Sequence, residues 1–223
     1  MAASDTTRLL VLGVARLFEP ANGYQLRREL LSWNVESWAS INPGSIYSML
    51  TTLTSQGMLE RFDLATAGSR PVAVYRSTEA GQKEIADLVR SGITTVQTFD
   101  RTPFYAAMSL SVSILPRAEV VDLLETRLAN LATAITGLRG ESHSTAVEAS
   151  VPPHVIPMFQ FPIALDEAEV AWITAFRQSV MNGDMLFADD DWTGWVPSAT
   201  DPSWRMADEQ REYLEKPASD KGE

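Results

Sequence analysis

The sequence contains no cysteine and only two histidines. Without cysteine the chain has no disulfides, iron–sulfur clusters or thiol nucleophiles. His143 and His154 both lie in a proline-rich stretch and lack the i, i+4 spacing of a helical zinc site, so we expect no metal. The chain also lacks a G-x-S-x-G motif and a glycine-rich phosphate loop. We therefore expect no enzyme and no cofactor.

Long apolar runs are missing as well. No stretch approaches the roughly 18 uninterrupted apolar residues typical of a membrane span. The short apolar run over 9–18 is broken by Arg16 and has no small-residue cleavage site, which argues against a secretory signal. We expect a cytoplasmic protein with no membrane partner, whose 223 residues form one large domain or two small ones.

Positive charge is scarce, with 18 Lys and Arg against 29 Asp and Glu. A net charge of −11 is unfavourable for a nucleic-acid binder, because phosphate contacts need a basic surface. The acids are unevenly distributed, however. Residues 1–90 contain nine basic and nine acidic residues, whereas 91–223 contain nine and twenty. The first part of the chain can therefore present a local basic face.

Periodicity in the first part predicts helices over 6–18, 24–32 and 43–56, strands over 58–63 and 72–76, and a helix over 78–91. The third helix starts at Asn42 and Pro43, a favourable cap and first residue. Three helices followed by a hairpin are the order of a winged helix-turn-helix, whose third helix enters the DNA major groove. The predicted fold is mostly α with a small β-hairpin.

The third helix is polar and uncharged on one side. Ile46, Leu50 and Leu53 fall on its apolar side, whereas Ser45, Ser48, Thr52 and Ser55 share the other. Alone, such a face is more often an ordinary solvated surface. Its position as the third helix of this order instead favours contact with DNA.

Four motifs carry a resemblance to a known family: NGY at 22–24, PGSIY at 43–47, LTSQGMLE at 53–60 and GSRPVAVYRSTEAG at 68–81. Their order and spacing resemble the DNA-binding domain of PadR-type transcriptional regulators, over about residues 7–90. The resemblance implies a winged helix-turn-helix domain at 1–92 that binds a double-stranded DNA operator. It also implies a C-terminal helical dimerisation or effector domain at 93–187, before an acidic, Trp-rich extension at 188–223.

The resemblance places DNA contacts on the second and third helices and on the wing hairpin. The expected residues are Tyr24, Asn42, Gly44, Ser45, Tyr47, Ser48, Thr52, Arg61, Arg70, Tyr75 and Arg76. The family usually has basic residues where this chain has Thr51 and Thr52, and a basic, aromatic wing where it has Val72 and Ala73. With fewer phosphate contacts we predict modest DNA affinity.

In the second part, a helix over 115–138 has apolar residues at alternating spacings of three and four, typical of a coiled-coil seam. These dimerisation candidates are Val121, Leu124, Leu128, Leu131 and Ile135. We expect the seam to face a helix over 164–184 and a second protomer, because a palindromic operator requires a two-fold dimer. The prolines of 140–162 predict an irregular loop between the two helices.

Several aromatic and methionine residues of the second part are candidates for an effector cavity, which we expect between the DNA-binding domain and the C-terminal helices. They are Phe104, Tyr105, Met108, Trp172, Phe176 and Met181. For any one of them a place in the core is the commoner role, but aromatics with methionine suit apolar ligands. The resemblance implies ligand-responsive repression, often by aromatic compounds.

The sequence therefore favours a homodimeric PadR-type repressor that binds a pseudo-palindromic operator and is released by a small apolar or aromatic effector. Two alternatives remain open. The winged helix has lost basic residues and could serve as a protein-interaction module, with Trp192, Trp195 and Trp204 meeting a partner. The chain could also be mainly a small-molecule-binding protein.

Overall fold

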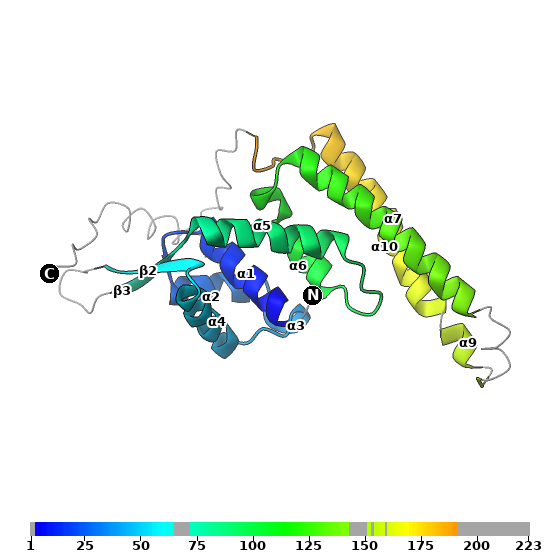
Figure 1. Ribbon diagram of the computed structural model, residues 1–223, viewed down its shortest axis with the longest axis horizontal. Helices are drawn as coiled ribbons and strands as arrows, with labels where there is room; N and C mark the ends of the chain where they lie inside the picture. Colours follow the sequence, from blue (N-terminus) through cyan, green and yellow to red (C-terminus); the bar gives the residue numbers. More distant parts are fainter. Residues whose placement is uncertain (1–2, 65–71, 143–150, 153, 159, 191–223) are drawn as a thin grey trace. The chain divides into compact units, whose positions relative to one another are not determined.

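The computed structural model describes residues 3–64, 72–142, 151–152, 154–158 and 160–190 (Figure 1). These residues form two compact units with a boundary between Leu88 and Val89. We call them the N-terminal and C-terminal units. The expected wing contact Arg70 and the three tryptophans beyond residue 190 lie outside the described residues.

The N-terminal unit consists of short helices and a small antiparallel sheet. Its elements are α1 (Ala3–Leu17), β1 (Ala21–Asn22), α2 (Gly23–Ser32), α3 (Val35–Trp38), α4 (Pro43–Ser55), β2 (Leu59–Leu64), β3 (Val72–Ser77) and the first part of α5 (Glu79–Thr94). The expected hairpin is present, and β1 extends it to a three-stranded sheet of order β1-β3-β2. The mostly helical fold with a small hairpin is confirmed.

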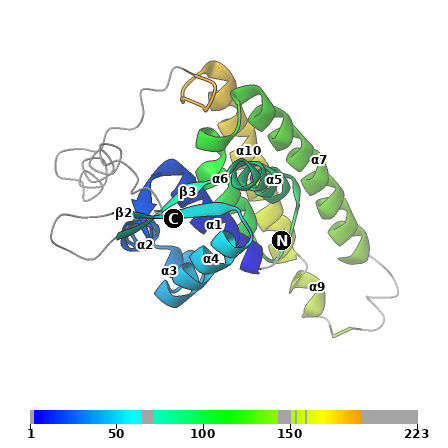
Figure 2. The same ribbon diagram turned by 60° about the vertical axis from the view of Figure 1, so that its left-hand side comes forward.

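The core of the N-terminal unit is built from α1, α2 and α4, which pack against one another (Figure 2). Leu9 and Leu12 of α1 are fully buried, as is Ile46 of α4. Each such side chain contributes about 1.5–3 kcal/mol through its removal from water. Because α4 is anchored by its apolar side, its polar side is left facing outward.

The start of α5 depends on a close approach to the sheet. The hydroxyl of Thr78 accepts a hydrogen bond from the Gly81 amide at 3.0 Å and so caps the helix. A Cβ at Gly81 would lie 2.1 Å from the carbonyl oxygen of Met58. Only glycine fits there, which explains the Thr-Glu-Ala-Gly run in physical terms.

The C-terminal unit contains the end of α5, then α6 (Thr102–Ile114), α7 (Arg117–Ser142), α9 (Val155–Met158) and α10 (Gln160–Asn182). The long helices α7 and α10 lie side by side in both views (Figures 1 and 2). None of the helices in the described part of the chain is long and apolar enough to cross a membrane.

The sequence predicted an irregular loop over 140–162, and this prediction is wrong at both ends. Helix α7 continues to Ser142, α9 occupies Val155–Met158, and α10 already begins at Gln160. Pro157 and Pro162 each stand third in their helix. In the first turn of a helix the backbone N–H has no partner within the helix, so proline is tolerated there.

The buried side of α7 also differs from the predicted seam. Its fully buried residues include Val120, Leu124, Arg127 and Leu131, whereas Val121 and Leu128 are only half-buried. An arginine thus occupies a core position of α7. It is tolerated there because its guanidinium group is surrounded by hydrogen-bond acceptors.

Candidate nucleic-acid interface and ligand pocket

The N-terminus of α4 is fixed by a capping box. The side chain of Asn42 accepts a hydrogen bond from the Ser45 amide at 2.9 Å, and the Asn42 amide donates to the Ser45 hydroxyl at 3.1 Å. Both residues were expected to contact DNA, and the structure gives both a role in starting the helix. Gly44 lies between them, where a Cβ would be 3.2 Å from the Asn42 side-chain oxygen.

The outward side of α4 presents hydroxyl groups. Tyr47 is 43% exposed, Ser48 is exposed and Thr52 is half-buried. The Thr52 hydroxyl donates to the Ser48 carbonyl at 3.0 Å, so its oxygen keeps lone pairs that can accept a hydrogen bond. The Tyr47 ring lies against α2, since a Cβ at Gly23 would be 3.0 Å from it.

The remaining expected contacts lie on α2 and the sheet. Tyr24 of α2 is 60% exposed. Arg61 of β2 pairs with Asp63 at 3.2 Å, and the Arg76 guanidinium lies 5.5 Å from the Phe62 ring centre. Tyr75 pairs with Arg61 across the hairpin. The described part of the wing therefore offers two exposed arginines.

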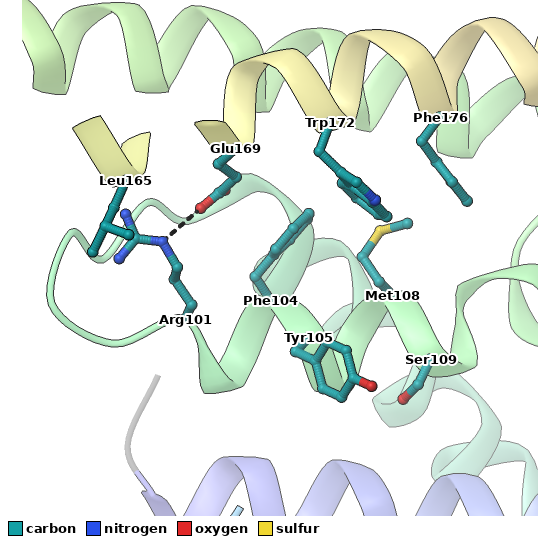
Figure 3. A pocket seen from close by; sticks show the side chains of 9 residues that line it. All are labelled: Arg101, Phe104, Tyr105, Met108, Ser109, Leu165, Glu169, Trp172 and Phe176. Carbon is teal, nitrogen blue, oxygen red and sulfur yellow. Dashed lines mark hydrogen bonds and ion pairs between the residues drawn. The ribbon is translucent and has the colours of Figure 1, made fainter. Parts of the chain in front are cut away.

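The C-terminal unit holds a pocket of about 610 Å³. Its lining comes from α6 with the residue before it, and from α10: Arg101, Phe104, Tyr105, Met108, Ser109, Leu165, Glu169, Trp172 and Phe176 (Figure 3). The structure brings together five of the six residues expected at the effector site, and Met181 does not line the pocket. The cavity was expected between two domains, but every residue that lines it belongs to the C-terminal unit. The sequence had not predicted α6, and without this helix the position of the cavity could not be foreseen.

Aromatic rings form one end of this pocket (Figure 3). Trp172 and Phe176 are stacked, with ring centres 5.0 Å apart and planes inclined by 14°. Phe104 meets Trp172 edge-on at 6.1 Å. These are the geometries that aromatic pairs prefer. Trp172 remains 48% exposed, so the stack is open to a ligand.

A buried ionic cluster adjoins the other end of the pocket, which two of its members, Arg101 and Glu169, line. Arg127, only 1% exposed, donates to Glu169 at 2.6 Å and to the carbonyl oxygens of Ile93 and Thr95 at 2.8 Å each. Its guanidinium group also lies 3.8 Å from the centre of the Phe104 ring. Burial lowers the pKa of Arg127, and Glu169 opposes this effect.

Arg101 completes the cluster. It donates to Asp166 at 2.6 Å, to Glu169 at 3.1 Å and to the Thr98 carbonyl at 2.7 Å. Burial raises the pKa of Asp166, whereas the positive charge of Arg101 lowers it. Sequence reasoning missed all four charged residues. The i, i+3 spacing of Asp166 and Glu169 was the only available hint, and it does not identify the partners.

The expected dimerisation residues are divided between two environments. Leu124 and Leu131 are fully buried within the protomer. Leu128 and Ile135 line a second groove between α7 and α10, of about 500 Å³. Dimerisation through this seam stays a prediction. Among the described residues, no group of three or more potential metal ligands is gathered.

A comparison with family models decides what the N-terminal unit is. Residues 11–87 match the transcriptional regulator PadR-like family. The N-terminal unit is a PadR-like domain. It holds the helices and the hairpin that carry the expected DNA contacts. The match ends at residue 87, before the first residue in the sequence that lines the pocket, Arg101.

The PadR-like domain and the rest of the chain also have distant structural relatives. Bacillus subtilis PadR in complex with operator DNA is 18% identical, with a TM-score of 0.33 and coverage of 76% of this chain and 97% of that one. The same protein in complex with p-coumaric acid is 17% identical, with a TM-score of 0.31 and coverage of 81% of this chain and 98% of that one. A protein from Streptococcus mutans UA159 is also 17% identical, with a TM-score of 0.33 and coverage of 75% of this chain and 96% of that one. No curated protein matches the chain.

Proposed function

We propose that this chain is a repressor of transcription that binds a pseudo-palindromic operator as a homodimer and is released by a small apolar or aromatic effector. The observation that carries the proposal is the outward face of α4, which is polar and uncharged and belongs to a PadR-like domain. A helix anchored by its apolar side and exposed on the other has the form of a recognition helix.

The hydroxyl groups of α4 are suited to read base edges. Because Thr52 gives its proton to a helix carbonyl, its oxygen is available to accept a hydrogen bond. Cytosine N4 and adenine N6 are the donors that the major groove offers. Ser48 and Tyr47 share this exposed face. We assign sequence preference to these three side chains.

The arginines of the wing are suited to phosphate contacts, which position a protein on DNA without reading its sequence. Arg61 and Arg76 are both exposed. Each phosphate contact changes the slope of log affinity against log salt by about −0.9. So few basic residues predict modest affinity and a shallow slope. Asn42 and Ser45 support this interface by fixing the start of α4.

The effector part of the proposal rests on the pocket of the C-terminal unit. A bound ligand can lower operator affinity only if it prefers a conformation of the dimer that fits the operator poorly. An open pocket with a half-exposed tryptophan also favours the second candidate function, a protein that mainly binds small molecules. The two differ in whether DNA is bound at all.

Two charge-removing variants test the interface. Arg61→Ala removes an exposed charge from β2, where it pairs with Asp63, and Lys83→Ala removes one from α5, where it pairs with Asp87. We expect Arg61→Ala to weaken binding to every duplex and to reduce the salt slope by about one, with Lys83→Ala as the unaffected control. Equal losses in both variants would contradict the assigned interface.

A third variant separates base reading from positioning. Ser48→Ala removes one hydroxyl from the exposed face of α4. We expect it to change the ranking of operators that differ at single base pairs, measured by fluorescence anisotropy, because a lost base contact affects only the sequence it reads. A uniform loss across all operators would show that Ser48 contacts phosphate instead.

A further inference from the structure

We propose that the pocket between α6 and α10 takes a flat aromatic cation and discriminates against aromatic carboxylates. The inference deepens the proposed effector role of this pocket and rests on it for its regulatory meaning. Three features of the C-terminal unit support it: the arrangement of the aromatic rings, the pairing of its arginines with carboxylates and carbonyl groups, and its negative net charge.

The shape and walls of the pocket suit a flat ring system. Its volume of about 610 Å³ falls within the range of small-molecule sites. Figure 3 shows Trp172 and Phe176 projecting from α10, with Phe104 and Met108 facing them from α6. A flat ligand can stack on the Trp172 ring, which is half-exposed and already stacks on one ring.

The two arginines of the cluster are already engaged. Arg101, which lines it, makes hydrogen bonds to Asp166, Glu169 and the Thr98 carbonyl through all three of its nitrogen atoms. Arg127 is held by Glu169 and two backbone carbonyls. The bonds of Arg101 use three of its five N–H donors, and its charge already faces two carboxylates. A ligand carboxylate bound there would either repel Asp166 and Glu169, whose side chains are 1% and 8% exposed, or displace one of them and leave it as a buried, unpaired charge.

The charge of the unit also disfavours an anion. The cluster itself contains two arginines and two carboxylates, so it offers no surplus positive charge to the pocket. Beyond the cluster, residues 89–192 contain four arginines, no lysine and eleven acidic residues. The resulting field attracts cations and repels anions.

The rings supply a favourable position for the positive charge. The face of an aromatic ring attracts a cation, most strongly for tryptophan. The C-terminal unit already uses this interaction, with the guanidinium groups of Arg127 over Phe104 and Arg117 over Phe187. In Figure 3, Trp172 and Phe176 lie at the end of the pocket away from Arg101. A ligand cation placed there is kept apart from the like charge of Arg101.

Three probes of nearly equal shape test the charge preference: 1-naphthylmethylammonium, 1-naphthalenemethanol and 1-naphthoate. Their affinities for the full chain are measured by calorimetry at neutral pH. We expect the ammonium compound to bind about tenfold more tightly than the carboxylate, with the alcohol between them. Equal or tighter binding of the carboxylate would overturn the inference, as would the absence of binding by all three.

Trp172→Leu tests whether the ring holds the charge. The variant keeps an apolar wall but removes the ring face, so we expect a larger loss for the ammonium compound than for the alcohol. Phe161→Leu is the matched control, since Phe161 is a 66% exposed aromatic residue of the same helix that does not line the pocket. Equal losses of both probes in Trp172→Leu would overturn the inference.

Operator binding of the same preparations separates this inference from the proposed function. Operator binding together with a preference for the carboxylate would reject the aromatic-cation site and leave the regulator intact. Tight, Trp172-dependent binding of the ammonium compound without any operator binding would support the site and reject the regulator.

Discussion

The two units of this chain stabilise their helices in different ways. The largest fully buried side chains of the N-terminal unit are leucines and isoleucines, whereas the largest in the C-terminal unit is Arg127. The N-terminal core is formed mainly by exclusion of water, which requires only apolar residues at the correct spacing. The C-terminal unit also relies on an ionic cluster, whose charges must be paired in a specific geometry.

This difference determines how each unit responds to substitution. An apolar core loses stability roughly in proportion to the buried area or volume that is lost. A buried ion pair behaves differently, because removal of one partner leaves the other charged and desolvated. We therefore expect the most damaging single substitutions of the C-terminal unit to lie in the cluster beside its pocket.

Arg127→Ala has the largest expected effect. It leaves Glu169 without one of its two arginines and the carbonyl groups of Ile93 and Thr95 without their donor. We expect a loss of about 3–5 kcal/mol in the free energy of unfolding. Urea unfolding followed by circular dichroism measures it.

The matched control is Arg139→Ala, which breaks the exposed pair of Arg139 with Glu167 in the same two helices. An exposed pair contributes about 0–1 kcal/mol. If Arg127→Ala costs no more than Arg139→Ala, the contrast between the two units is wrong.

Gly81→Ala has the next largest expected effect and acts on the N-terminal unit. The new methyl group would lie 2.1 Å from the Met58 carbonyl oxygen, so α5 or the bend before β2 must move. We expect a loss of about 1–3 kcal/mol in the free energy of unfolding, as for other overpacked sites. Thermal or urea unfolding can measure the loss.

Gly137→Ala gives the opposite result in the C-terminal unit. Among the described residues, no atom apart from the adjoining residues and the backbone of α7 itself lies within 4 Å of a Cβ at this position. Alanine is the better helix former, so the variant should gain about 0.5–1 kcal/mol. Equal effects of the two glycine substitutions would show that the close approach at Gly81 does not constrain the fold.

Asp166→Asn also removes a partner of Arg101, and the part of its effect that depends on pH is the smallest effect that we expect. Burial raises the pKa of Asp166, so the folded chain keeps a proton there over a pH range in which the unfolded chain has lost it. In that range, which begins near the ordinary aspartate pKa of about 4, rising pH lowers the stability.

The asparagine variant lacks this titration. The stability of the wild type minus that of the variant should therefore fall as pH rises above about 4. Unfolding free energies of both proteins at a series of pH values give this difference. A difference that stays constant or grows with pH would contradict the assigned shift.

The two units also differ in how well the sequence predicted them. Local patterns specified α4 almost to the residue, because Asn42 and Pro43 mark its start and Ile46, Leu50 and Leu53 mark its buried side. They also identified the five aromatic and methionine residues that gather at the pocket. In these places local preference and tertiary packing agree.

Prediction failed where tertiary contacts override the pattern. Leu128 fits the heptad spacing better than Arg127, yet Arg127 is the buried residue, because its acceptors come from the end of α5 and from α10. The two-residue strand β1 was not among the predicted elements, since only its pairing with β3 makes it a strand. Contacts between distant parts of the chain leave no local signal in a single sequence.

Binding of the full chain to its own upstream DNA tests the central claim most directly. Fluorescence anisotropy compares that fragment with a scrambled duplex of equal length over a series of salt concentrations. The account predicts tighter binding to the upstream fragment, with affinity that falls as salt rises. No binding to either duplex at low salt would contradict it and would show that this PadR-like domain serves a partner other than DNA.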